Sequence, residues 1–92
     1  MELLMNKLSI LTPALEGRDQ ELLGYQINID NYILAIAKIN SDYPDNDDLL
    51  AFRDELQARL DEERRQQLRS KVIRDVIADQ LAQLTPLEDS EQ

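Results

Sequence analysis

The sequence predicts an all-α protein folded as a long antiparallel helical hairpin of the coiled-coil type. Three observations predict it: a seven-residue apolar repeat in the first half, a proline-bearing acidic connector at 41–45, and the absence of glycine and proline from 46 to 84. The chain has 92 residues, two of them glycine, and is rich in helix-favouring Leu, Ala, Glu, Gln and Arg. We therefore expect a single helical domain over residues 1–84.

The first half is expected to form a short helix at about 2–11 and a major helix at about 13–41. Thr12-Pro13 suits a helix N-cap followed by the first helical position. The apolar repeat occupies two series of positions, each spaced by seven: Leu8, Leu15, Leu22, Ile29 and Ile36, and then Leu4, Leu11, Arg18, Tyr25, Tyr32 and Ile39. Two glycines, also seven apart at Gly17 and Gly24, indicate either the close approach of another backbone or a hinge near Gly17.

The connector contains the strongest local signal for a helix end and a new helix start. Pro44 ends the first helix, because the residue before a proline is disfavoured in helical conformation. Asp45 or Asn46 can then cap the second helix. Asp47 and Asp48 lie in its first turn, where the helix dipole favours negative charge.

The second helix is expected at about 46–84 and is followed by an acidic flexible tail at 85–92. Its apolar stripe runs through Leu49, Phe52, Leu56, Leu60, Leu68, Val72, Val76 and Leu81. Residues 61–67 interrupt this stripe, since none of them is apolar. We interpret them as a polar layer in a continuous helix, which charged pairs four residues apart help to stabilise. The alternative is a break near 62–66, which gives a compact three-helix bundle.

A register for the hairpin follows from folding the chain at the connector. Facing residues then have numbers that sum to about 86–88, which places Arg64 near residues 22–24. Glu21 and Tyr25 are within reach of Arg64 or Arg65 in this register. We expect one of these guanidinium groups to pair with the carboxylate and to lie on the ring, with its charged end in water.

The apolar residues of both helices extend beyond one narrow stripe, as the doublets Leu22-Leu23 and Val72-Ile73 illustrate. A helix with more than one apolar stripe needs more than one neighbour. We therefore expect two hairpins to dimerise into a four-helix bundle. The residues assigned to the core seam or to self-association are Leu8, Leu15, Leu22, Tyr25, Ile29, Tyr32, Ile36, Leu56, Leu60, Leu68, Val72 and Val76.

The charge of the chain is unevenly distributed. A net charge of −9 disfavours binding to nucleic acid or to an anionic membrane surface. The candidate partner-binding acidic face comprises Asp47, Asp48, Asp54, Glu55, Asp61 and Glu62. A candidate basic patch follows at Arg64, Arg65, Arg69, Lys71 and Arg74. The start of the chain lacks the pattern of a secretory signal, and the longest apolar run, at 32–37, is too short to span a bilayer.

The sequence contains no motif typical of a catalytic, metal or cofactor site. The chain contains neither cysteine nor histidine, which excludes disulfides, thiol nucleophiles and histidine-dependent catalysis. The segment DNDDLLAFRDE lacks the glycine and the ligand spacing of a calcium-binding loop. Two carboxylate pairs with magnesium-ligand spacing, Glu16-Asp19 and Asp45-Asp48, lie too far apart in a hairpin to share one ion. We expect no enzymatic activity, no metal and no cofactor.

The sequence supports three hypotheses about function, and no motif in it points to a known family. The first is a cytoplasmic, homodimeric helical adaptor or regulator that binds a protein partner of unknown identity. The second is an acidic inhibitor that occupies the basic groove of a nucleic-acid-processing protein, in the manner of accessory proteins of phages and mobile elements. The third is weak nucleic-acid binding through residues 64–74.

Overall fold

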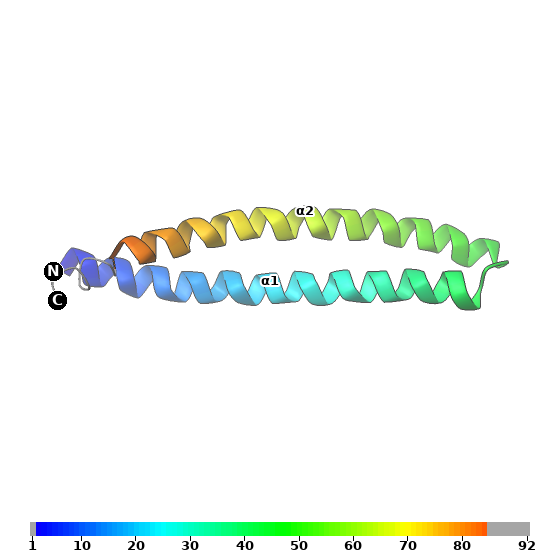
Figure 1. The fold of residues 1–92 in the computed structure, drawn as a ribbon, viewed down its shortest axis with the longest axis horizontal. Helices are drawn as coiled ribbons and strands as arrows, with labels where there is room; N and C mark the ends of the chain where they lie inside the picture. The colour runs from blue at the N-terminus through cyan, green and yellow to red at the C-terminus, as the bar shows by residue number, and fades with distance from the viewer. Residues whose placement is uncertain (1, 85–92) are drawn as a thin grey trace. The chain divides into compact units, whose positions relative to one another are not determined.

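The protein is an all-α helical hairpin. The structure, a computed structural model, describes the backbone of residues 2–84 and the side chains of residues 5–84. Helix α1 spans Glu2–Asp42 and helix α2 spans Asp47–Leu84, and no strand occurs between these limits (Figure 1). The predicted acidic tail at 85–92 lies outside the described residues.

The connector is short and is closed by hydrogen bonds at both ends. The Tyr43 amide donates to the Ile39 carbonyl at 2.9 Å, which completes the last turn of α1. The Asn46 side-chain oxygen accepts from the Leu49 amide at 3.0 Å, so Asn46 is the N-cap of α2. The two aspartates that follow, Asp47 and Asp48, occupy the first turn of α2, as the sequence predicted.

Helix α1 does not break at Thr12-Pro13, and the expected division into helices at 2–11 and 13–41 is wrong. Pro13 lies inside the continuous helix. A proline at such a position removes one backbone hydrogen bond and crowds the preceding turn. Leu8, Leu11 and Leu15 are half-buried on both sides of Pro13. The apolar repeat therefore continues through the proline, and this packing offsets the local preference for a new helix start.

Helix α2 is continuous through residues 61–67, so the alternative three-helix bundle is wrong. Side-chain hydrogen bonds within the helix span this polar segment. Arg65 donates to the Glu62 carboxylate at 2.9 and 2.6 Å, and Gln66 donates to the same carboxylate at 2.8 Å. Gln57 donates to Asp61 at 3.1 Å. Such pairs, three or four residues apart, favour the helix where few side chains are packed.

The chain divides into two compact units, each containing a segment of both helices. The hairpin unit is Leu23–Leu68 and includes the connector. The terminal unit combines Met1–Leu22 with Arg69–Gln92. Within each unit the two helical segments run antiparallel (Figure 1).

The register within the hairpin unit differs from the predicted one. Side-chain hydrogen bonds join the two helices there, among them Arg53 to Asn40 at 2.9 Å, Gln67 to Gln26 at 2.8 Å, and Asn28 to Glu63 at 3.3 Å. The residue numbers of these pairs sum to 93, 93 and 91, compared with the expected 86–88. Part of the difference is the turn, since its flanking residues, Asp42 and Asp47, sum to 89. The rest follows from side-chain direction, because helical side chains tilt toward the N-terminus of their own helix.

Candidate interaction surfaces

The seam of the hairpin unit is an apolar core edged by polar contacts. Ile29, Ile39, Leu56 and Leu60 are buried, with 3–7% of their surface exposed. The predicted seam residues Tyr25, Tyr32 and Ile36 are half-buried beside them. Burial of these four aliphatic side chains, each contributing about 1.5–3 kcal/mol, is the main stabilising interaction of this unit.

The α2 side of the seam in the terminal unit begins with the polar residues Ser70 and Arg74 and continues with the half-buried Ile77, Leu81 and Leu84. Ser70 is the one residue in the described part of this unit that is fully buried, at 4% exposed, and its hydroxyl has no hydrogen-bond partner there. The predicted seam residues of α1 in this unit, Leu8, Leu15 and Leu22, are only half-buried. The terminal unit therefore lacks, over its described residues, the fully buried apolar side chains that stabilise the hairpin unit.

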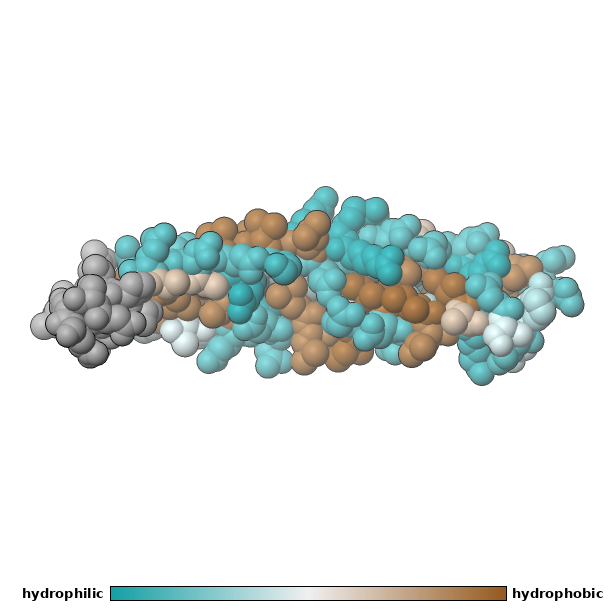
Figure 2. Space-filling model, viewed as in Figure 1, coloured by the Kyte–Doolittle hydropathy of each residue, from teal (hydrophilic) through white to brown (hydrophobic). Residues whose placement is uncertain are grey.

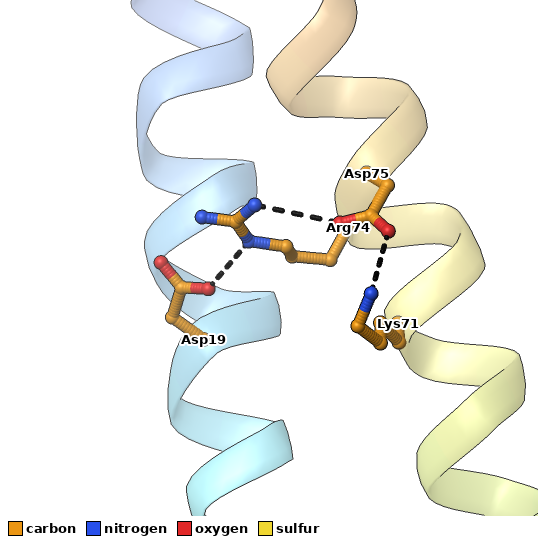
Figure 3. Close-up of polar contacts among 4 residues, drawn as sticks. All are labelled: Asp19, Lys71, Arg74 and Asp75. Carbon is orange, nitrogen blue, oxygen red and sulfur yellow. Dashed lines mark hydrogen bonds and ion pairs between the residues drawn. The ribbon is translucent and has the colours of Figure 1, made fainter.

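An ion-pair chain crosses the terminal unit at Arg74 (Figure 3). The Arg74 guanidinium reaches across to Asp19 on α1 at 2.9 Å and contacts Asp75 at 3.4 Å, while Lys71 pairs with Asp75 at 3.1 Å. The hydrogen bond to Asp19 raises the pKa of Arg74 above its usual value. The hydrogen bond from Lys71 lowers the pKa of Asp75. All four groups are at least one-third exposed, so these ion pairs orient the two helices more than they stabilise the fold.

The second half of α2 turns its apolar residues outward. Val72, Ile73 and Val76, which we call the outer patch, are 56%, 45% and 48% exposed. Leu68, at 64%, is exposed on the same helix in the hairpin unit. Figure 2 shows apolar surface over this half of α2. Leu68, Val72 and Val76 were assigned to the core seam or to self-association, and the structure excludes them from the seam.

The predicted apolar stripe of α2 does not face α1 along its whole length, because its residues from Leu60 to Val76 are spaced by multiples of four. Each step of four residues turns a helix by about 40° more than one full turn. The four steps from Leu60 to Val76 therefore move the side chain by about 160° around the helix, away from α1. The residues of α2 that face α1 instead follow a seven-residue repeat, and they are Leu49, Arg53, Leu56, Leu60, Glu63, Gln67, Ser70, Arg74, Ile77, Leu81 and Leu84. This alternation of four- and three-residue steps is present in the sequence, but the polar residues at the centre of the series obscure it.

Helix α1 also carries outward apolar residues in the hairpin unit. Leu23, Ile27 and Leu34 are 56%, 52% and 66% exposed.

The two glycines of α1 are not sites of close packing. Gly17 and Gly24 have open space where a side chain would begin, with no neighbouring atom within 4 Å beyond the local helix backbone, and neither has a positive φ. The expected close approach of a backbone at these glycines is therefore not made within the described chain, and α1 continues through Gly17 without a hinge.

The six carboxylates of the predicted acidic face are all exposed and lie on one side of α2 in the hairpin unit. They form three adjacent pairs that repeat every seven residues: Asp47-Asp48, Asp54-Glu55 and Asp61-Glu62. A seven-residue repeat advances about 10.5 Å along a helix, so the face carries one charge per about 5 Å. Glu62 also pairs with Arg65 at 2.6 Å, which lowers the net charge at one end of the face.

The structure does not bring the predicted basic patch together. Arg74 lies in the seam, while Arg65 and Arg69 lie on the opposite side of α2. Three of the five cations already pair with carboxylates, since Arg65 binds Glu62, Lys71 binds Asp75 and Arg74 binds Asp19. A surface that binds phosphate groups needs several unpaired cations on one face, and the five basic residues are not arranged in this way.

Arg65 and Glu21, two charged residues of the expected contact between the helices, each form an ion pair along their own helix. Arg65 pairs with Glu62 on α2, and Glu21 pairs with Arg18 on α1 at 3.2 Å. Arg64 is exposed. Neighbours three residues apart on one helix meet without ordering a second helix, which favours these local pairs.

Within the described residues, no group of three or more acidic side chains is arranged to hold a metal ion. Neither helix, over the same residues, has a stretch long and apolar enough to cross a membrane. Comparison of the chain with known protein families, with curated proteins and with solved structures finds no match.

Proposed function

We propose that the chain is a non-enzymatic, cytoplasmic protein–protein interaction module that acts as a homodimeric helical adaptor or regulator. The observation that supports it is the imbalance of apolar surface. Among the described residues, twelve large apolar side chains are at least 40% exposed, whereas four are buried. A helix pair that leaves so much apolar surface outside its seam gains stability by association, and two hairpins that form a four-helix bundle provide it.

The mass of the full chain in solution tests this proposal. Sedimentation equilibrium should give twice the chain mass of 10.7 kDa at concentrations on the order of tens of micromolar. A mass of one chain over the whole range would contradict the homodimer. Affinity capture from the native host then distinguishes an adaptor from a protein that only self-associates. An adaptor should retain a second protein in a constant molar ratio to the captured chain.

A second candidate function is inhibition of a nucleic-acid-processing protein through the acidic face. The observation in its favour is the regular repeat of three exposed carboxylate pairs along one side of α2. One charge per about 5 Å is sparser than a DNA strand, which carries one per about 3.4 Å, so the mimicry is incomplete.

Competition with a fluorescent DNA duplex for a DNA-binding protein with a basic groove tests the second candidate. The chain should displace the duplex, and neutralising Asp54, Glu55, Asp61 and Glu62 to the amides should abolish displacement. The matched control neutralises Glu16, Glu21, Asp30 and Asp42, which are exposed on α1 and lie off this face. Equal displacement by both variants would contradict a role for the acidic face.

A further inference from the structure

We propose that the outer patch of α2 is covered by the same patch of a second copy, with the two helices antiparallel and related by a two-fold axis. This inference rests on the proposed homodimer and specifies its interface, which joins the two hairpins through α2 alone in place of a closed four-helix bundle. The outer patch lies wholly within the terminal unit, whose described seam has no fully buried apolar residue. Contact with a second copy would therefore bury apolar side chains in the unit that has no fully buried apolar residue of its own among the described residues.

The charges that flank the patch are arranged for self-pairing. Arg69 lies three residues before Val72, and Asp79 lies three residues after Val76. In an antiparallel pair centred on position 74, Val72 faces Val76 of the second copy. Arg69 then faces Asp79 of the second copy, and the same contact occurs twice by symmetry. A surface whose apolar centre carries opposite charges at equal distances on its two sides is complementary to itself.

Both flanking charges are available for this contact. Arg69 and Asp79 are exposed, and neither has an ion pair or side-chain hydrogen bond within the described residues. The other cations of this segment, such as Lys71 and Arg74, already bind carboxylates of the same chain. Arg69, Val72, Val76 and Asp79 lie within about 80° of one another around the helix, so one partner helix can contact all four.

The outward residues of α1 do not have this property. An antiparallel pair that places Leu23 against Leu34 of a second copy also places Ile27 against Asp30. A carboxylate would then lose water against an apolar side chain near the centre of the contact. The α1 residues therefore provide a matched control, with similar exposure and no self-complementary charges.

Charge reversal tests the arrangement, using the full chain in sedimentation equilibrium. Arg69→Asp brings two carboxylates together at each of the two symmetric contacts of a homodimer, and Asp79→Arg brings two guanidinium groups together there. Each variant alone should dimerise at least about tenfold more weakly than the wild type, because like charges face each other. An equimolar mixture of the two variants should regain dimerisation through mixed pairs. In a mixed pair each of the two contacts joins a carboxylate of one variant to a guanidinium of the other, so both contacts are again between opposite charges.

The double variant Arg69→Asp with Asp79→Arg exchanges the two charges within one chain. Both symmetric contacts of its homodimer are again between opposite charges, so it should dimerise within about threefold of the wild type. A double variant that is as weak as the single variants would overturn the antiparallel two-fold arrangement.

A second pair of variants tests the apolar centre. Val72→Asp should abolish dimerisation, whereas Leu34→Asp, at a more exposed apolar site on α1, should leave it unchanged. Helix content from far-ultraviolet circular dichroism should match the wild type in both variants, since both positions are at least half exposed. If Val72→Asp loses helix, the charge variants still test the arrangement.

The outcomes separate this inference from the homodimer itself. A wild type of single-chain mass would overturn both. A dimeric wild type that neither charge reversal nor Val72→Asp weakens would overturn the interface alone and leave the homodimer standing.

Discussion

The hairpin unit and the terminal unit are built from the same two helices, yet they are stabilised differently. In the hairpin unit Leu56 and Leu60 face α1 and are buried. In the terminal unit the equivalent positions of α2 begin with Ser70 and Arg74 and continue with Ile77, Leu81 and Leu84, which are only half-buried, while Val72 points to solvent. The comparison indicates that helix propensity and short-range pairs are sufficient to form α2, and that its apolar residues are fully buried against α1 in the hairpin unit alone, among the described residues.

The largest difference between the units should appear on truncating an apolar residue of α2. Leu60→Ala should lower the free energy of unfolding by about 2–5 kcal/mol, because it leaves a cavity in the seam. Val72→Ala, measured on chains dilute enough to be monomeric, should change it by less than about 0.5 kcal/mol, because the side chain is exposed. Urea denaturation followed by circular dichroism measures both. Equal losses would contradict the assignment of Val72 to the outside of α2.

A smaller effect of opposite sign is expected at Ser70. Its buried hydroxyl lacks a partner, and an unsatisfied buried polar group costs about 1–3 kcal/mol. Ser70→Ala should therefore raise the free energy of unfolding by about 1 kcal/mol, since alanine also favours the helix. The exposed Ser9 provides the control, because its hydroxyl donates to the Asn6 carbonyl at 2.9 Å. A loss of stability in Ser70→Ala would show that its hydroxyl has a partner.

The two glycines allow the same substitution in each unit. Gly17→Ala in the terminal unit and Gly24→Ala in the hairpin unit should each stabilise the monomer by about 0.5–1 kcal/mol, because alanine favours the helix and meets no neighbour. Thermal melts of dilute protein measure this. A destabilisation that appears only at high protein concentration would instead indicate that another chain packs on that glycine.

The smallest effects concern one surface ion pair from each unit and their pH dependence. A hydrogen bond from Lys71 lowers the pKa of Asp75, and one from Lys38 lowers the pKa of Asp42. A carboxyl group whose pKa is lowered by folding stabilises the folded state above its unfolded pKa of 3.8, and this contribution is lost as the pH falls through the lowered pKa.

Asp75→Asn and Asp42→Asn should each lower the melting temperature slightly at neutral pH. Each variant should then converge on the wild type in acid, below the lowered pKa. For Lys38 the sign is reversed, because its raised pKa gives stability that is lost as the pH rises above 10.5. Melting curves across the pH range measure all three. A difference between variant and wild type that persists unchanged in acid would contradict the assigned pairs.

The sequence predicts the fold class and the seam of α1, because that seam is a nearly uninterrupted apolar repeat. It does not predict the seam of α2 beyond Leu60, since Glu63, Gln67 and Ser70 occupy the facing positions and apolar residues four apart suggest another face. The helix break expected at Pro13 does not form for a related reason, because half-buried apolar residues on both sides of the proline keep α1 continuous. The acidic face is predictable from charge spacing alone, whereas the scatter of the basic residues depends on how α2 is rotated.

We expect the stability of the terminal unit to depend on a second chain and that of the hairpin unit to be independent of it. Hydrogen exchange measured over a dilution series distinguishes the two units, because exchange reports stability separately for each part of the chain. The amides of residues 69–84 should exchange more slowly as protein concentration rises, while the exchange rates of residues 49–62 should not change. Exchange that is independent of concentration in both segments would contradict it.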